Sequence, residues 1–238
     1  MLDILYQDEF LVAINKPSGL LVHRSLIDTR EHEFALQLTR DQIGQRVYPV
    51  HRLDRPTSGV LLFALSSDIA RVISEQFSER GVSKEYLALV RGFTDESGHI
   101  DYALKEQLDK ISDANADNDK EAQDAVTDYR RLEQQELPFA VGRYNSARYS
   151  WISLTPHTGR KHQLRRHMKH IFHPIVGDTT HGDGKQNTFV REQYNCQRLM
   201  LHASSLTLLH PVSGLELTLN ASLPDDLSEP LLQMGFTA

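Results

Sequence analysis

The chain has 238 residues, one cysteine and a formal net charge of −6 at neutral pH. Its length suits one large domain or two small ones, and the single cysteine excludes an intrachain disulfide and any zinc site made of several cysteines. No apolar run approaches the roughly eighteen residues of a membrane span, and the N-terminal stretch MLDILYQDE is acidic where a secretory signal would be basic. We therefore expect a cytoplasmic protein that does not associate with membranes.

The apolar pattern predicts more strands than helices. In chain order, strands are expected at residues 2–6, 10–14, 60–65, 84–92, 149–154, 199–209 and 215–219. Helices are expected at residues 34–44, 67–81 and 161–170, the second of them capped by Ser66 or Ser67 and closed by Gly81. Short turns join many of these elements, which favours an α+β fold with a mainly antiparallel mixed sheet flanked by helices and loops. No repeat or linker divides the chain, so we expect a single domain over residues 1–238.

Charge is distributed unevenly along the chain. No acidic residue occurs between Glu136 and Asp178, a segment that carries seven arginines and lysines and five histidines. The preceding segment, residues 95–136, holds thirteen acids against five bases. Within it, a polar insertion at about 108–125 has no apolar period and is expected to be an exposed loop. A basic face beside an acidic flank can bind a polyanion such as RNA despite the net charge, and the alternative is a solvated basic face without a partner.

The sequence His51-Arg52-Leu53-Asp54-Arg55-Pro56-Thr57-Ser58-Gly59, before the strand at 60–65, carries the first candidate active-site residue. Asp54 lies between two arginines on a predicted turn. Positive charge nearby keeps a carboxylate ionised even in a dry pocket, where it can act as a nucleophile or a base. The alternative from these residues alone is a surface ion pair that stabilises the turn.

A second motif, Thr158-Gly159-Arg160-Lys161-His162-Gln163-Leu164-Arg165-Arg166-His167, begins the helix predicted at 161–170. Its cations add to the positive field of a helix N-terminus. If Leu164 and Met168 face the core, Arg165 lies at the edge of that face, where it can be partly buried and contact a carboxylate. Arg166 is expected to be solvated or to contact a phosphate.

These motifs resemble the signatures of the RluA-type pseudouridine synthases, H-R-L-D-x-x-T-S-G-[LV] at residues 51–60 and T-G-R-x-H-Q-[IL]-R-x-H at residues 158–167. Residues 84–92, KEYLALVRG, resemble a third signature of that family, K-x-Y-x-A-x-V-x-G. Its K-P-x-G, L-H-A and H-P-x-[ST]-G elements are matched at residues 16–19, 201–203 and 210–214. The likeness runs from residue 2 to about residue 219, so the N-terminal RNA-binding S4 domain of many relatives is expected to be absent.

The resemblance implies a pseudouridine synthase catalytic fold and a role for particular residues. Asp54 would be the catalytic residue, Arg165 would pair with it, and Tyr86 would stack on the target uracil. On general grounds a tyrosine on an alternating strand is more often a core residue. Arg52 would enter the RNA stack where the flipped base had been. The residues expected to contact RNA are Arg52, Arg55, Arg160, Lys161, His162 and Arg166.

Within the family the likeness is closest to enzymes that modify tRNA, which implies a uridine of the T-arm as the substrate. Two alternatives remain at this stage: a synthase of the same family acting on ribosomal RNA, and a non-catalytic RNA-binding module on the same scaffold. Whether Asp54 attacks the sugar, attacks the base or removes a sugar proton is also open. We expect no cofactor, no obligate protein partner and a monomer. The spacing of His162, His167, His170 and His173 matches no known metal site, so no metal is expected either.

Overall fold

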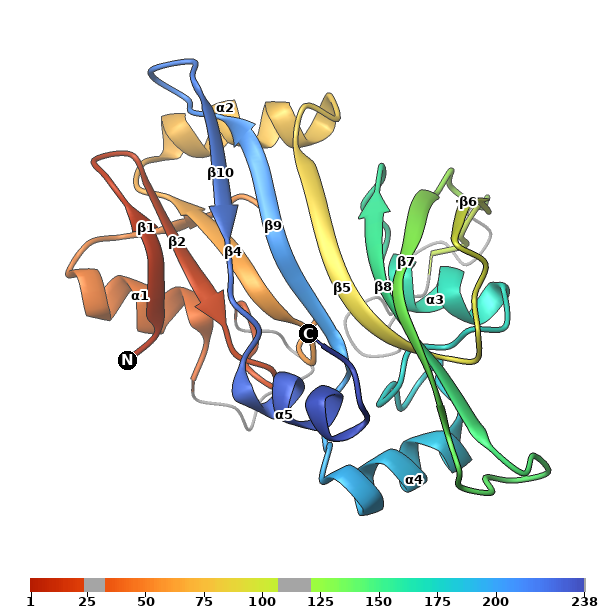
Figure 1. Ribbon diagram of the computed structural model, residues 1–238. Helices are drawn as coiled ribbons and strands as arrows, with labels where there is room; N and C mark the ends of the chain where they lie inside the picture. The colour runs from red at the N-terminus through yellow and green to blue at the C-terminus, as the bar shows by residue number, and fades with distance from the viewer. Residues whose placement is uncertain (24–32, 107–120, 238) are drawn as a thin grey trace.

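The computed structural model describes residues 1–23, 33–106 and 121–237. Within these ranges a ten-stranded sheet has the order β1-β2-β4-β9-β5-β8-β7-β6, with β10 beside β9 and β3 beside β4 (Figure 1). The strands are β1 (Asp3–Gln7), β2 (Leu11–Lys16), β3 (Tyr48–Pro49), β4 (Ser58–Ala64), β5 (Ser83–Arg91), β6 (Ser97–Asp101), β7 (Val126–Leu137), β8 (Ala147–Pro156), β9 (Leu201–Leu209) and β10 (Glu216–Asn220). Strands β4 and β9 pair in parallel, and the other pairs between named strands are antiparallel.

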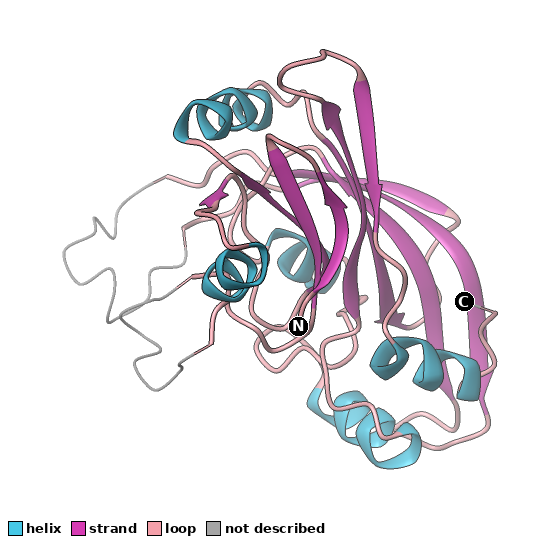
Figure 2. Ribbon diagram, turned by 90° about the vertical axis from the view of Figure 1, so that its left-hand side faces the viewer, coloured by secondary structure: helices cyan, strands magenta, loops and turns pink. Residues whose placement is uncertain are grey.

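Helices pack on both faces of the curved sheet (Figure 2). They are α1 (Ala35–Ile43), α2 (Ser67–Ser78), α3 (Gln163–His170), α4 (Gly184–Tyr194) and α5 (Asp225–Gln233). All seven residues of β4 are buried, because alternate side chains face different helices. Val60 and Leu62 pack with Ile73 of α2, whereas Leu61 and Phe63 pack with Ala35 of α1.

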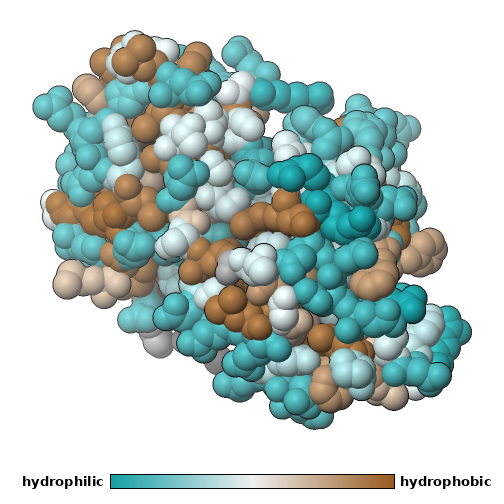
Figure 3. Space-filling view, in the orientation of Figure 1, coloured by the Kyte–Doolittle hydropathy of each residue, from teal (hydrophilic) through white to brown (hydrophobic). Residues whose placement is uncertain are grey.

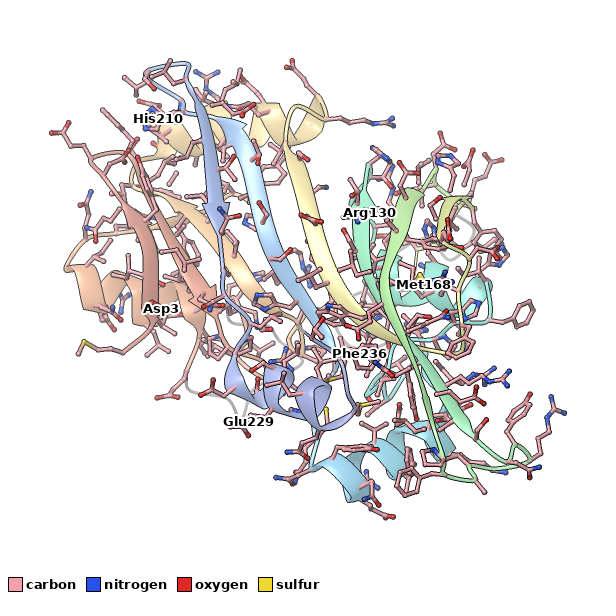
Figure 4. The ribbon with its side chains drawn as sticks, viewed as in Figure 1. Asp3, Arg130, Met168, His210, Glu229 and Phe236 are labelled. Carbon is pink, nitrogen blue, oxygen red and sulfur yellow. The ribbon has the colours of Figure 1, made fainter. Side chains whose placement is uncertain are left out.

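The other half of the sheet is covered in the same way. On β5, Ala88 and Val90 face a cluster that includes Leu164 and Met168 of α3. Leu89, on the opposite face of the strand, joins a cluster that includes residues of α4 and α5. Figure 4 shows Met168 on α3, where it is fully buried against the strands. This packing fixes α3 on the face of the sheet to which Tyr86 also belongs.

The α+β class with a mainly antiparallel mixed sheet is confirmed, and several element boundaries were wrong. Helix α2 ends at Ser78, and Arg80, rather than Gly81, takes the left-handed conformation after it, with a φ of 60°. Helix α3 begins two residues later than expected, after His162. The polar insertion lies largely in residues 107–120, outside the described ranges, but its last residue, Ala125, is fully buried and not exposed.

Five elements had no counterpart among the predicted ones: the two-residue strand β3, and β6, β7, α4 and α5. Strand β7 is twelve residues long but mostly charged and polar, and its buried residues are Thr127 and Tyr129 near its start and Leu137 at its end. None of the helices in the described ranges is both long and apolar enough to cross a membrane. In the orientation of Figure 1, apolar side chains on the surface form scattered groups separated by polar ones (Figure 3).

Candidate active site

A cavity of about 650 Å³ lies where the loop before β4, the start of β5 and the loop between β8 and α3 meet. The residues predicted to act in catalysis all line it: Asp54, Tyr86 and Arg165. Of the predicted RNA-binding residues, Arg52, Arg160, Lys161 and His162 also line it, whereas Arg55 and Arg166 are not among its described lining residues. Segments more than a hundred residues apart therefore contribute to one cavity.

The loop that carries Asp54 is a tight turn. The backbone N–H of Thr57 donates to the carbonyl of Asp54 at 3.0 Å, and the chain then enters β4. Gly59, next on that strand, has a φ of 114° and lies so close to Ala203 of β9 that a Cβ would meet the carbonyl oxygen of Ala203. Only glycine tolerates both conditions, so the Ser-Gly at the end of the motif allows β9 to pack directly behind the Asp54 loop.

The turn at residues 16–19 holds the Asp54 loop from behind. Lys16 is fully buried and donates to three backbone carbonyls, those of Pro17 and Leu20 at 2.8 Å and that of Arg55 at 3.1 Å. Burial, reinforced by the charge of Arg198, lowers the pKa of Lys16 to about 7. The ammonium group thus links two loops through carbonyl oxygens, and this explains why a lysine stands before Pro17.

The Asp54 carboxylate contacts the guanidinium of Arg165, whose Nη1 lies 3.2 Å from Asp54 Oδ2. The same guanidinium donates two further hydrogen bonds to Asp178, from Nε at 2.7 Å and from Nη2 at 2.9 Å. Burial disfavours the charge of Arg165, but the carboxylate of Asp178 outweighs it and raises the pKa of the guanidinium. Arg165 is therefore a fixed cation shared by two carboxylates, one buried and one in the cavity.

Asp178 belongs to the candidate site through Arg165, and sequence reasoning missed it. Its side chain has no exposed surface, and its carboxylate also accepts hydrogen bonds from the backbone N–H groups of Thr180 and His181, both at 2.9 Å. Burial acts to raise its pKa, but Arg165 and these N–H groups lower it below the usual value. The available signal was its position: it is the first acid after the long acid-free segment.

Tyr86 extends from β5 into the cavity. It pairs with Leu154 of β8 and Ala203 of β9, which places it on two central strand pairs of the sheet. Burial, and to a lesser degree the charge of Asp54, raise the pKa of Tyr86 far above its ordinary value. The phenol is therefore neutral at physiological pH and can pack against a ring or donate one hydrogen bond.

The loop before α3 is shaped by side chains of the second motif. Gln163 accepts hydrogen bonds from Thr158 Oγ1 at 2.7 Å and from the backbone N–H of Arg160 at 3.0 Å, and it donates to the carbonyl of Val126 at 3.0 Å. His162 adopts a left-handed backbone conformation with a φ of 55°. Its Nε2 lies 3.9 Å from Asp54 Oδ2. Burial lowers the pKa of His162, so its ring adds a neutral polar wall beside Asp54.

The cations of the two motifs occupy different positions. Arg52 is exposed at the rim of the cavity, and Arg160 donates to the carbonyl of Asp124 at 3.0 Å beside it. Arg55 instead points back to the carbonyl of Gly19, 3.0 Å from its Nε. Arg166 is half-buried on the side of α3 near Tyr102. In the parts of the chain that the structure describes, no group of three or more His, Cys, Asp or Glu side chains is arranged to hold a metal ion.

Comparisons with known proteins agree on one family. A family described as RNA pseudouridylate synthase matches residues 10–170. The chain is 55% identical to the tRNA pseudouridine synthase C of Haemophilus influenzae over 99% of both chains, and 57% identical to that of Vibrio cholerae over 99% of this chain and 97% of the relative. A solved structure, human RNA pseudouridylate synthase domain containing 4, superposes with a TM-score of 0.72 at 29% identity over 98% of this chain and 93% of that one.

Proposed function

The chain belongs to the RNA pseudouridylate synthase family and is an isomerase that converts uridine to pseudouridine, and from this premise we propose that it acts on a T-arm uridine of tRNA with Asp54 as its catalytic carboxylate. The single observation that carries the proposal is the contact of Asp54 with Arg165 inside the cavity, at 3.2 Å. Asp178, on the far side of the guanidinium, keeps that contact in one orientation.

The reaction needs the base to leave the helical stack, because its reacting atoms are inaccessible inside a duplex. The bond between C1′ of the ribose and N1 of uracil then breaks, the detached base turns, and a new bond joins C1′ to C5. The hydrogen on C5 leaves as a proton, and N1 gains a proton. Attack on C1′, attack on the base and removal of a sugar proton all require the ionised carboxylate of Asp54, and the Arg165 guanidinium stabilises that ion.

The remaining lining residues have supporting roles in this proposal. Tyr86 is neutral, so it packs against the uracil face while the base turns and does not compete with Asp54 as an anion. Arg52, exposed at the rim, fills the place that the flipped base leaves, since a planar guanidinium can stack between bases. Arg160 and Lys161 contact the RNA backbone next to the cavity.

The proposed substrate is tRNA because the curated relatives with more than half of their residues identical are named tRNA pseudouridine synthase C. A tRNA substrate also implies the cytoplasm as the place of action. We propose that the enzyme works as a monomer without a cofactor, since one chain supplies Asp54, Arg165 and Tyr86 to a single cavity.

Mapping of pseudouridine in RNA from cells that lack this protein tests the proposal. The expected result is the loss of one pseudouridine in the T-arm of particular tRNAs, restored by the wild-type gene but not by Asp54→Asn. Asparagine keeps the shape of the side chain and deletes the ionised oxygen, so RNA binding by the purified variant should stay near the wild-type level. Loss of a ribosomal RNA pseudouridine instead, or turnover by Asp54→Asn at the wild-type rate, would contradict the proposal.

A further inference from the structure

The cavity continues beyond the residues that face the uracil. From Asp54 and Tyr86 it extends to a second end, where α2 finishes and β5 begins, and Phe77, Arg80 and Lys84 line that end. A volume of about 650 Å³ exceeds that of one pyrimidine ring several-fold. The second end therefore has room for a neighbouring part of the RNA.

Lys84 at this end has no counter-charge among the residues that the structure describes. Its side chain is half-buried, and among the described residues none forms an ion pair or a side-chain hydrogen bond with its ammonium group. Burial lowers the pKa of Lys84, and no carboxylate acts in the opposite direction. Of the described residues that line the whole cavity, Asp54 alone is acidic, and Arg165 already contacts it. A partly buried cation without a partner among the described residues is costly, so an anion that enters from outside would be bound favourably.

The neighbours of Lys84 strengthen the case for an anion. His51 accepts a hydrogen bond at Nε2 from the backbone N–H of Leu62 at 2.9 Å, which leaves the ring proton on Nδ1 as a donor. Burial, together with the charge of Lys84, lowers the pKa of His51 to about 4, so the ring is neutral at physiological pH. Arg80 adds a second, exposed cation. This end of the cavity thus offers two cations and contains no acid among its described lining residues.

The spacing matches a nucleotide. Lys84 and Tyr86 are two residues apart on β5, so their side chains leave the same face of the strand about 7 Å apart. In a nucleotide, one ribose separates the base from its phosphates. Resting on the proposed function, we propose that Lys84, assisted by Arg80, binds a phosphate next to the target uridine while Tyr86 packs against its base.

Neutral backbone linkages test the assignment directly. RNA substrates would carry an uncharged methylphosphonate at either the 5′ or the 3′ linkage of the target uridine, and each would be assayed with wild-type enzyme, Lys84→Met and Lys84→Arg. Lys84→Met should raise the half-saturating RNA concentration roughly tenfold, which is the usual effect of losing one charged hydrogen bond, with the maximal single-turnover rate little changed. Lys84→Arg should restore most of the affinity. Lys185→Met, on the exposed side of α4, is the matched control and should have no effect.

The decisive result is that the effects of the neutral linkage and of Lys84→Met on RNA affinity do not add. At one of the two linkages, the neutral substrate should bind the wild-type enzyme as weakly as the charged substrate binds Lys84→Met. The Lys84→Met variant should bind the neutral and the charged substrates equally well. The assignment would be overturned if, at both linkages, the neutral linkage and Lys84→Met each reduced RNA affinity independently. It would also be overturned if Lys84→Met lowered the maximal rate and left the half-saturating RNA concentration unchanged. If Lys84→Met does not fold, Lys84→Gln takes its place. Failure of the proposed function would show separately, as wild-type enzyme that binds the tRNA but forms no pseudouridine.

Discussion

Replacement of Arg165 by lysine should damage both the active site and the fold, although it keeps the charge. The guanidinium makes three hydrogen bonds, two to Asp178 at 2.7 and 2.9 Å and one to Asp54 at 3.2 Å. One ammonium nitrogen cannot reproduce this planar arrangement. The side chains of Arg165 and Asp178 are 6% and 0% exposed, so breaking their pair should lower the free energy of unfolding by about 3–5 kcal/mol.

The effect on the reaction follows from the third hydrogen bond. Asp54 is 21% exposed, and loss of a charged hydrogen bond to such a group costs about 1.5–3 kcal/mol, which lowers the single-turnover rate about 10- to 150-fold. Affinity for RNA should change little. The matched control is Arg166→Lys, because Arg166 is half-buried on the same helix and is not among the described residues that line the cavity.

Both variants would be assayed by release of the C5 hydrogen from labelled tRNA, at a temperature where circular dichroism shows them folded, and by thermal unfolding. Equal rates for the two variants, or a larger loss for Arg166→Lys, would refute the argument that Arg165 holds the catalytic carboxylate.

Three further results are expected. Exhaustive chelation of transition metals should leave activity intact in buffers with controlled magnesium, since the described residues offer no metal-binding group; a loss that zinc restores would contradict this. RNA affinity should fall steeply as salt concentration rises, despite the net charge of −6. The basic residues of the acid-free segment would displace several counterions from the RNA phosphates on binding. A flat salt dependence would exclude that segment as the RNA-binding face. Burial lowers the pKa of His202 from 6.5 to about 4, so as pH falls the unfolded chain binds its proton first, and this residue should contribute about 2 kcal/mol to the drop in the free energy of unfolding between pH 7.5 and pH 5. His51 and His181, whose pKa values are lowered in the same way, add to the total drop. His202→Gln should make the total drop smaller by about 2 kcal/mol in chemical denaturation, and an unchanged drop would contradict the prediction.

The pairing of Asp54 with Arg165 could be predicted from the sequence, but the contact of Arg165 with Asp178 could not. Helical spacing placed Arg165 on the same side of α3 as Leu164 and Met168, and all three are buried. That its partner would be Asp54 came from the family resemblance, since 111 positions separate the two residues. Asp178 was missed because its role depends on the tertiary approach of the chain after α3 to Arg165, and no local spacing encodes that approach.

The missed elements share a physical cause. Strand β7 has polar and charged side chains over most of its length, so the alternation that marks a half-buried strand is visible only at Thr127 and Tyr129. Helix α4 buries Gln186 along with Val190 and Tyr194, and a polar residue within the buried stripe weakens the helical pattern. Helix α5 contains Pro230. In each case tertiary packing decides the structure against a weak local preference.

Strand β9 lies between β4 and β5, although it is made more than a hundred residues after either of them. While the chain emerges from the ribosome, β4 and β5 therefore exist without the strand that joins them. Asp54 precedes one of these strands and Tyr86 belongs to the other, so the proposed active site is assembled only after β9 has been made. A nascent or truncated chain that ends before Leu201 has both halves of the proposed site but lacks the strand that joins them, so we expect such a fragment to be inactive.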